Sequence, residues 1–267
     1  MTQDRGSDGK AVTRRSSGGG SRTARGRGER GGPVPVVIES RVDDPGRVEW
    51  RREQIVQAAV ARFARAGYHG TTIKDIAESA GFSTGLIYSY VKDKEDVLFL
   101  VFMHIFETYQ RHIPARLEGV DEPLQRLCTA VRAYCEAVDR NIGATVVGYR
   151  ESASLRPELR KAVQRMELET NRLIAEPIEA CIAAGYVEPG DVDLLTFDLV
   201  LMAHGWALKQ WHFAGRVTLD AYVAEGLRLN LEGVLSDAGR RRLRALPAPP
   251  SSDGAPDGGN AGRRRTS

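Results

Sequence analysis

The sequence has no apolar run of about 18 residues, the length that a helix needs to cross a membrane. An apolar stretch is also missing from the N-terminus, which is rich in glycine and arginine where a secretory signal would be apolar. We therefore expect neither export nor membrane insertion, and we predict a cytoplasmic protein.

Cysteine is scarce in this chain of 267 residues. The three cysteines, Cys128, Cys135 and Cys181, cannot all pair within one chain. In a reducing compartment we expect buried thiols in preference to a disulfide or a metal site.

The motifs of common enzyme classes are missing as well. The five histidines form no i, i+4 metal pair, the cysteines lack C-x-x-C spacing, and no G-x-S-x-G, P-loop or G-x-G-x-x-G followed by a strand is present. We expect no enzymatic activity, no cofactor and no metal. His104 and His204 lie on apolar segments, so we interpret them as interior residues with satisfied hydrogen bonds.

The sequence does contain an uneven distribution of charge around a formal net charge of +3. Basic residues outnumber acidic ones by eight to three in residues 1–32 and by seven to three in residues 236–267. Residues 47–94 have a net charge of +3, whereas residues 95–235 have a net charge of −7. A small basic block followed by a larger acidic one indicates two functional units, the first suited to a polyanion.

Apolar residues recur at helical spacing from Val48 to Leu235, and nothing alternates with a period of two, so we predict an all-α fold. Pro177 should kink one long helix, because its ring removes a backbone hydrogen bond. The expected helices cover residues 48–66, 72–80, 84–90, 93–114, 122–140, 143–153, 157–184, 191–213 and 218–235.

Residues 71–95, TTIKDIAESAGFSTGLIYSYVKDKE, combine two short helices with a tight turn. Thr72 and Asp75 form a capping pair that starts the first helix, Gly81 ends it, and Ser83 can cap the second. The second helix begins with small polar residues, which let it enter a DNA major groove because bulky ones would hold it away from the bases. The pattern predicts a helix-turn-helix.

Several side chains of this motif are candidates for DNA contact. Thr72 and Ser83 lie where hydroxyls and helix N-terminal amides can bind phosphate, with Tyr88, Tyr90 and Lys94 on the other side. The alternative is that the tyrosines are half-buried core rings and that Lys92 and Lys94 are solvated. The candidate DNA-binding residues are Thr71, Thr72, Lys74, Ser83, Thr84, Gly85, Tyr88, Ser89, Tyr90 and Lys94.

A family pattern is carried by Phe63, Gly67-Tyr68, Gly70-Thr71-Thr72-Ile73, Asp75-Ile76-Ala77, Ala80-Gly81-Phe82-Ser83, Gly85, Leu86, Tyr88, Tyr90 and Lys92-Asp93-Lys94-Glu95. With these residues the chain closely resembles the TetR family of bacterial transcriptional regulators over about residues 51–110. Val91 stands where that family usually has phenylalanine. The resemblance implies a homodimer, a helical ligand-binding domain, repression as the default and release of DNA by ligand. It also places Thr72, Tyr88 and Lys94 at phosphate-contacting positions and residues 83–90 in the recognition helix.

The domain organisation follows from the motif and from the composition of the two ends. The ends have too few apolar residues to offset the entropy of ordering them. We predict a disordered basic arm and linker (1–46), a three-helix DNA-binding domain with a helix-turn-helix (47–94), a ligand-binding and dimerisation domain of about six helices (95–235), and a disordered tail (236–267).

Dimerisation can be argued from the residues too. Two copies of so short a recognition helix, related by a twofold axis, would read a palindromic operator in double-stranded DNA. The last two core helices carry apolar residues on more than one face, so we predict that they form a four-helix interface. The alternative is that they merely close their own domain.

A small-molecule effector is expected in the second half. Arg150 and Lys209 are cationic candidates beside apolar neighbours, and the phrases around residues 149–167 and 203–215 resemble the fatty-acid-metabolism, acyl-CoA-sensing subgroup of the family. An apolar channel with a cation at its mouth suits a long-chain acyl-CoA, which is our hypothesis for the effector. The apolar candidates, for which plain core packing is the alternative, are Phe102, Phe106, Tyr149, Met166, Leu173, Met202 and Trp206.

A second function class is an architectural protein that coats DNA without reading its sequence. Arg- and Gly-rich tails can bind nucleic acid through charge alone. A complete helix-turn-helix and a ligand-sized second half argue against this class. A footprint separates the two, because a regulator protects a discrete palindrome and a coating protein protects DNA uniformly.

Overall fold

The computed structural model describes residues 38–246, and in this range the chain is helical, with no strand beyond an isolated bridge between Val187 and Leu235. The chain divides into residues 1–34 and residues 35–267, so all described residues belong to the second unit. Its helices are α1 (Pro45–Ala66), α2 (Ile73–Ala80), α3 (Thr84–Ile87), α4 (Lys94–Leu117), α5 (Pro123–Arg140), α6 (Ile142–Glu151), α7 (Pro157–Ala183), α8 (Val192–Leu208), α9 (Gln210–Phe213), α10 (Leu219–Leu231) and α11 (Asp237–Ala245), with a 3-10 turn at Ser152–Ser154.

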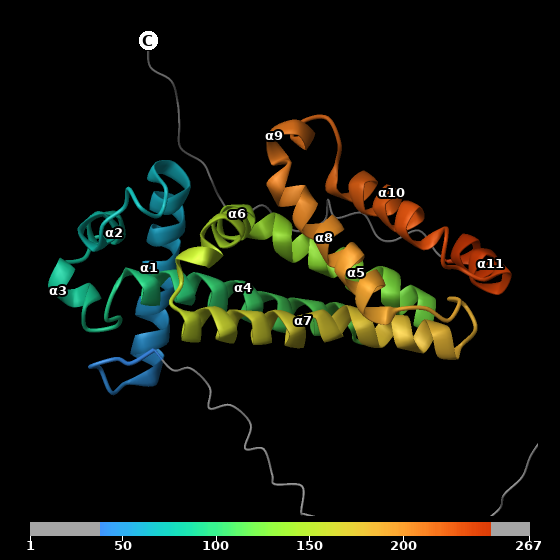
Figure 1. The fold of residues 1–267 in the computed structure, drawn as a ribbon, viewed down its shortest axis with the longest axis horizontal. Coiled ribbons are helices and arrows are strands. Elements are labelled where there is room, and N and C mark those ends of the chain that lie inside the picture. The colour runs from blue at the N-terminus through green and yellow to red at the C-terminus, as the bar shows by residue number, and fades with distance from the viewer. Residues whose placement is uncertain (1–37, 247–267) are drawn as a thin grey trace, which may run out of the picture. The chain divides into compact units, whose positions relative to one another are not determined.

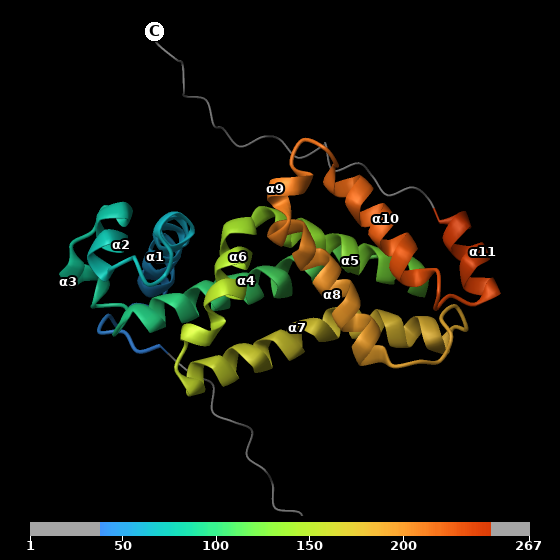
Figure 2. The same cartoon turned by 45° about the horizontal axis from the view of Figure 1, so that its top comes forward.

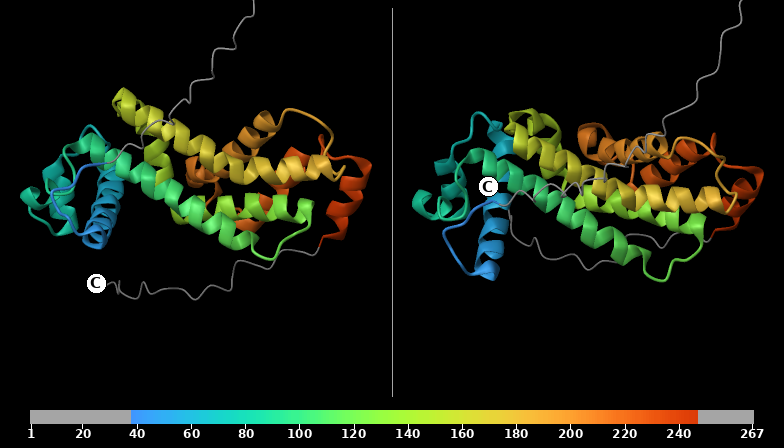
Figure 3. Two further views of the ribbon diagram at one scale, coloured as in Figure 1. Left: turned by 90° about the horizontal axis from the view of Figure 1, so that it is seen from below. Right: turned by 60° about the horizontal axis from the view of Figure 1, so that its bottom comes forward.

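Helices α1, α2 and α3 gather at one end of this unit, and α4 leads from them into the larger helical part (Figure 1). There α4 and α7 run side by side, with α5 packed against both (Figures 2 and 3). Helix α8 packs on α5, α6 and α7, and α10 packs on α5 and α8. Helix α4 is therefore shared between the helix-turn-helix and the larger part of the unit.

Two helix ends differ from the sequence prediction because capping and burial override local signals. Helix α1 begins at Pro45, within the expected linker, because Asp44 caps it by accepting from the Arg47 amide at 3.2 Å. Helix α4 continues past Pro114 to Leu117. Its face remains buried there, with Leu117 6% exposed, and this burial outweighs the hydrogen bond that the proline removes.

One other helix was predicted with the wrong continuity. The helix expected over residues 191–213 breaks at Lys209 into α8 and the short α9. Helix α7 runs as a single helix through the buried Pro177 to Ala183, as predicted. Helix α10 ends at Leu231, before the predicted end at residue 235.

The prediction of a disordered tail from residue 236 is wrong for residues 236–246. Ser236 caps α11 by accepting from the Gly239 amide at 3.0 Å, and its own amide donates to the Tyr186 carbonyl at 2.9 Å. Gly239 is buried, and Arg242 pairs at 3.2 Å with Glu122, the residue that caps α5. The basic residues of this segment resembled a solvated tail, but its ordering depends on partners far away in sequence. Residues 247–267 and residues 1–37 lie outside the described part.

The cysteines are free thiols in the interior, as predicted. Cys135 and Cys181 are buried and Cys128 is partly buried. Burial raises the pKa of Cys128 to about 11 and that of Cys135 to about 12, so both are protonated at neutral pH. Between residues 38 and 246, no helix combines the length and the apolar character that a membrane span needs.

Candidate nucleic-acid interface and effector cavity

The first helix of the helix-turn-helix is held by its own side chains. The Thr72 hydroxyl accepts from the Asp75 amide at 3.2 Å, and the Asp75 carboxylate accepts from the Thr72 amide at 2.8 Å, which completes a capping box. Hydrogen bonds from Thr72, together with Arg62 at 3.1 Å, lower the pKa of Asp75. The start of α2 is therefore locally fixed and carries an ionised carboxylate.

The turn and the second helix follow the sequence prediction, except in helix length. Gly81 ends α2 in the left-handed conformation with φ of 71°, which glycine adopts without steric cost. Ser83 caps α3 by accepting from the Leu86 amide at 3.2 Å. Helix α3 has only four residues, and the chain continues as a turn to Tyr90.

Most candidate DNA contacts lie on the outside of this motif. Adding a Cβ at Gly85 would meet no atom within 4 Å, so its small size leaves open space in front of α3 and is not required by packing. Thr84 and Ser89 are partly exposed. The exposed candidates are Thr72, Lys74, Ser83, Gly85 and Tyr88.

Two candidates lie in the interior, contrary to the prediction. Thr71 is 1% exposed, and its hydroxyl donates to the Gly67 carbonyl at 2.8 Å, so it closes the turn after α1. Tyr90 is also 1% exposed and packs in the core. The alternative reading of Tyr90 as a core ring is therefore the correct one, and neither side chain can reach DNA from this position.

Lys94, the first residue of α4, is partly buried and makes hydrogen bonds within its own chain. Its ammonium donates to the Tyr68 and Thr71 carbonyls, each at 2.9 Å, and lies 4.4 Å from the centre of the Tyr68 ring. An ammonium has three donors, so one is left for a phosphate. Lys94 thus connects α4 to the loop between α1 and α2.

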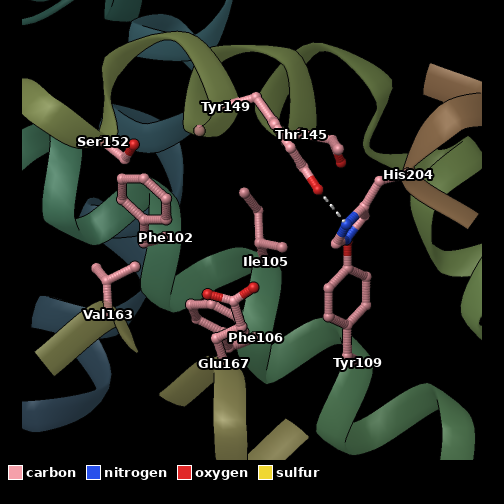
Figure 4. Close-up of a pocket in the computed structure, with 11 residues that line it drawn as sticks. Phe102, Ile105, Phe106, Tyr109, Thr145, Tyr149, Ser152, Val163, Glu167 and His204 are labelled. Carbon is pink, nitrogen blue, oxygen red and sulfur yellow. Dashed lines mark hydrogen bonds between the residues drawn. The ribbon is translucent and has the colours of Figure 1, made fainter. Parts of the chain in front are cut away.

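A cavity of about 190 Å³ lies beside α4 in the larger helical part. Four helices contribute to its wall (Figure 4). The lining residues are Phe102, Ile105, Phe106 and Tyr109 of α4, Thr145, Gly148 and Tyr149 of α6, Ser152 of the 3-10 turn after α6, Val163 and Glu167 of α7, and His204 of α8.

His204 is an interior residue with satisfied hydrogen bonds, as predicted, and it also lines the cavity. Its Nδ1 lies 2.9 Å from the Tyr149 hydroxyl and its Nε2 lies 3.3 Å from the Tyr134 hydroxyl. Burial lowers the pKa of His204 to about 4, so the imidazole is neutral at physiological pH. His104, by contrast, is partly exposed and lies between α1 and α4.

Glu167 is the acidic residue of the cavity wall. Burial raises its pKa, and among the residues the structure describes no cation forms an ion pair with it. Among residues 38–246, the wall contains no lysine or arginine. The cavity is therefore unfavourable to an anionic group.

Two family models match the chain. The model for bacterial regulatory proteins of the tetR family matches residues 55–101, and the model for a tetracyclin repressor-like C-terminal domain matches residues 120–234. The chain belongs to the TetR family. The resemblance inferred from the motif and the all-α prediction are confirmed, and the chain is a DNA-binding transcriptional regulator.

Curated relatives and solved structures agree with this assignment. The HTH-type transcriptional regulator HbdR of Aromatoleum sp. (strain CIB) is 45% identical over 210 residues, which cover 79% of this chain and 92% of HbdR. A tetR-family regulatory protein from Rhodococcus RHA1 superposes with a TM-score of 0.63 at 26% identity, over 70% of this chain and 98% of its own. AibR, solved in complex with isovaleryl coenzyme A and operator DNA, has a TM-score of 0.60 at 20% identity, over 68% and 98%. These named relatives are regulators, in agreement with the expectation that the chain is not an enzyme.

The cavity of this TetR-family regulator includes only part of the predicted effector site. Phe102, Phe106 and Tyr149 line it, whereas Arg150 and Lys209 are exposed and lie outside its wall. Neither cation is part of the lining, and the expectation of a cation near the mouth of the cavity stays a prediction.

The remaining predicted residues have other roles. Leu173 lines a separate hollow near Pro114, and Met202 packs over Gly226, whose added Cβ would lie 2.2 Å from the Met202 sulfur. Trp206 is buried and donates to Asp139 at 2.6 Å. Met166 is partly buried against the core, outside the cavity wall.

Most of the cavity residues, both those predicted and those missed such as Ile105, Tyr109, Thr145 and Gly148, share a helical spacing. Phe102, Ile105, Phe106 and Tyr109 occupy one face of α4, and Thr145, Gly148, Tyr149 and Ser152 repeat the same offsets on and just after α6. Each of the two helix faces carries aromatic and hydroxyl side chains at the same offsets. This repeated pattern is the signal in the sequence that could have identified the cavity.

Proposed function

We propose that this regulator is a repressor that binds a palindromic operator as a homodimer and is released when a compact, neutral acyl group occupies the cavity. The observation that carries the proposal is the double role of α4. Its first residue, Lys94, holds the loop between α1 and α2, and the next turns of the same helix form one wall of the cavity.

The start of α4 is also tied to the start of α7. Arg156 donates to Asp93 at 3.3 Å and to Asp96, and its amide donates to Glu95 at 2.7 Å. An occupant between α4, α6 and α7 would press on helices whose ends meet at this cluster. A small shift of α4 would carry Lys94 and the helix-turn-helix with it and change the spacing of two half-sites.

Exposed apolar side chains on α8 and α10 support a dimer through these helices. Leu194 is 66% exposed, Leu201 is 52% exposed and Phe197 is 37% exposed, and these three share one face of α8. Leu229 of α10 is 61% exposed. An apolar set of this kind on two neighbouring helices is typical of a protein interface.

The volume of the cavity limits the size of the effector that it can hold. About 190 Å³ exceeds a cavity of ~150 Å³ that holds benzene and is smaller than the roughly 300 Å³ of a drug-sized site. A short branched acyl group or a single ring fits this space, whereas the long acyl chain of the sequence hypothesis exceeds it. AibR, solved with isovaleryl coenzyme A, indicates that a protein of this fold can bind a short acyl-CoA.

The charge of the cavity favours a thioester over a free acid. A free carboxylate would lie near Glu167 without a cation to balance it, and burial of two like charges is unfavourable. A coenzyme A thioester removes the acyl carboxylate and keeps its phosphates outside the cavity.

The test is operator mapping followed by DNA release. A footprint should protect a discrete palindrome, whereas uniform protection would support the architectural alternative. Fluorescence anisotropy of the labelled operator should fall with isovaleryl-CoA or phenylacetyl-CoA and stay unchanged with the free acids, palmitoyl-CoA or coenzyme A alone. The effector proposal is wrong if no thioester of a compact acid releases DNA.

A further inference from the structure

Two buried hydroxyl groups in the cavity wall lack hydrogen-bond partners. Tyr109 is 1% exposed and Thr145 is 3% exposed, and apart from each other neither hydroxyl has a hydrogen-bond partner among residues 38–246. The two side chains are near each other, but even a mutual hydrogen bond would leave one proton unused. Because buried polar groups are nearly always paired, these hydroxyls indicate a missing partner inside the cavity.

The hydrogen bonds of His204 indicate a third hydroxyl proton in the cavity wall that has no acceptor. A neutral imidazole has one donor nitrogen and one acceptor nitrogen. Tyr134 is fully enclosed and has the His204 Nε2 as its one hydrogen-bond partner in the described structure. We assign its hydroxyl as the donor, because the other imidazole tautomer would leave the buried Tyr134 proton unpaired. His204 Nδ1–H then donates to the Tyr149 oxygen, which leaves the Tyr149 proton free.

These groups lie at one end of the cavity. Figure 4 shows the hydroxyls of Tyr109, Thr145 and Tyr149 gathered around His204, while Phe102 and Val163 line the opposite end. The cavity therefore has an apolar part and a polar end that offers at least two protons. Tyr149 is also 44% exposed, so its proton can reach a molecule that enters from outside.

We propose that the effector carries a neutral oxygen, as a hydroxyl or carbonyl group, on its compact apolar part, and that Tyr109, Thr145 and Tyr149 bind this oxygen at the His204 end of the cavity. This inference rests on the proposed function, since it assumes that the cavity is the effector site. The oxygen accepts from Tyr149 and from one of the two orphaned hydroxyls. His204 is a positioning residue, because it holds the Tyr149 hydroxyl with its proton turned away from the imidazole.

The oxygen also determines selectivity. An analogue without it would leave the same hydroxyls unpaired in a cavity closed by the ligand, whereas the correct ligand pairs them. The expected preference for an oxygenated ligand over its unsubstituted twin is about tenfold or more in Kd. Ordered water could satisfy the hydroxyls equally well with both twins, and then no preference would be measured.

The experiment compares matched pairs of thioesters on the full chain without DNA. Isothermal titration calorimetry gives Kd for isovaleryl-CoA against 3-hydroxyisovaleryl-CoA, and for phenylacetyl-CoA against 4-hydroxyphenylacetyl-CoA. A ketone twin, 3-oxobutanoyl-CoA against butanoyl-CoA, tests the carbonyl. We expect the oxygenated member of at least one pair to bind about tenfold more tightly.

Three variants then assign the preference to the cavity. Tyr109→Phe, Thr145→Val and Tyr149→Phe each remove one hydroxyl, and each should reduce the ratio of the two Kd values within a pair. Tyr186→Phe, at a partly buried tyrosine outside the cavity wall, is the matched control and should change neither. Because Tyr109 and Thr145 are unpaired in the free protein, their variants should not lower its Tm.

The outcomes separate this inference from the proposed function. Equal affinity of both members in all three pairs overturns the inference and leaves the proposed function standing. Loss of affinity for both twins together with a lower Tm would assign the hydroxyls a structural role and also overturn it. If no thioester binds while the operator is still bound, both the effector class and the oxygen site are wrong.

Discussion

At the scale of the residue, hydrogen bonds decide which side chains of the helix-turn-helix remain available to DNA. Thr71 and Thr72 are neighbours of the same type, yet the Thr71 hydroxyl is turned inward to the Gly67 carbonyl and Thr72 is exposed at the cap of α2. Lys94 divides its donors between two carbonyls of its own chain and the solvent side. Fewer side chains are therefore available for DNA contact than the number of polar residues in the motif suggests.

His204 makes the stability of the protein depend on pH. Its pKa is about 4 in the folded state and 6.5 in the reference state, so below pH 6.5 the unfolded chain binds a proton that the folded chain does not. Above pH 6.5 His204 does not lower the free energy of unfolding. Between pH 6.5 and pH 4 its titration should lower that free energy by about 3 kcal/mol.

The measurement for His204 is urea unfolding at a series of pH values, with His204→Gln as the comparison. The variant lacks this titration, so its stability should change less between pH 6.5 and 4 than that of the wild type. Parallel pH curves for the two proteins would contradict the assignment of a buried neutral imidazole.

At the scale of the element, α11 is held by a close backbone contact. A Cβ added at Gly239 would lie 2.0 Å from the Tyr186 carbonyl oxygen and 2.9 Å from a Leu235 methyl, so the backbone of α11 would have to move. Gly239→Ala should lower the free energy of unfolding by about 1 to 3 kcal/mol, although alanine is the better helix former.

The matched control for Gly239 is Gly233→Ala, where an added Cβ meets nothing within 4 Å. This substitution should change the free energy of unfolding by less than about 0.5 kcal/mol. Thermal unfolding of both variants tests the contact, and equal Tm values would show that α11 contributes nothing to the fold.

The elements that could be predicted from the sequence are those fixed by local chemistry. Thr72 with Asp75, Gly81 and Ser83 specify the helix-turn-helix within about ten residues, so its caps were predicted correctly. Helix α11 was missed because Gly239 is ordered by Tyr186, which is far away in sequence.

The effector site was harder to predict for a related reason. The aromatic residues Phe102, Phe106 and Tyr149 were identified by type, but the cations Arg150 and Lys209 were assigned to a cavity that they do not line. Which residues share a cavity depends on how α4, α6, α7 and α8 face one another, and no single helix contains that information.

At the scale of the whole molecule, the exposed face of α8 predicts the oligomeric state. Replacing Leu194 and Leu201 together with glutamate should convert the dimer to a monomer, because like charges would meet across the twofold axis. Operator affinity should fall by on the order of 100-fold when two linked half-site contacts become one.

Leu168→Glu is the control for the dimer prediction, since Leu168 of α7 is 57% exposed and lies on a different helix. Sedimentation velocity should find this variant dimeric and the α8 variant monomeric. A dimer that survives both glutamates on α8 would place the interface elsewhere.

If the proposed effector site is correct, the carboxylate of Glu167, which has no ion-pair partner among residues 38–246, determines which metabolic state the regulator detects. A regulator whose cavity rejects the free acid does not respond to a nutrient that has merely entered the cell. It responds after ATP-dependent ligation or another activating reaction has joined that acid to its carrier. Gene expression would then follow the rate at which the acid is converted to its thioester. The acid alone, without this activation, would leave the operator occupied by the regulator.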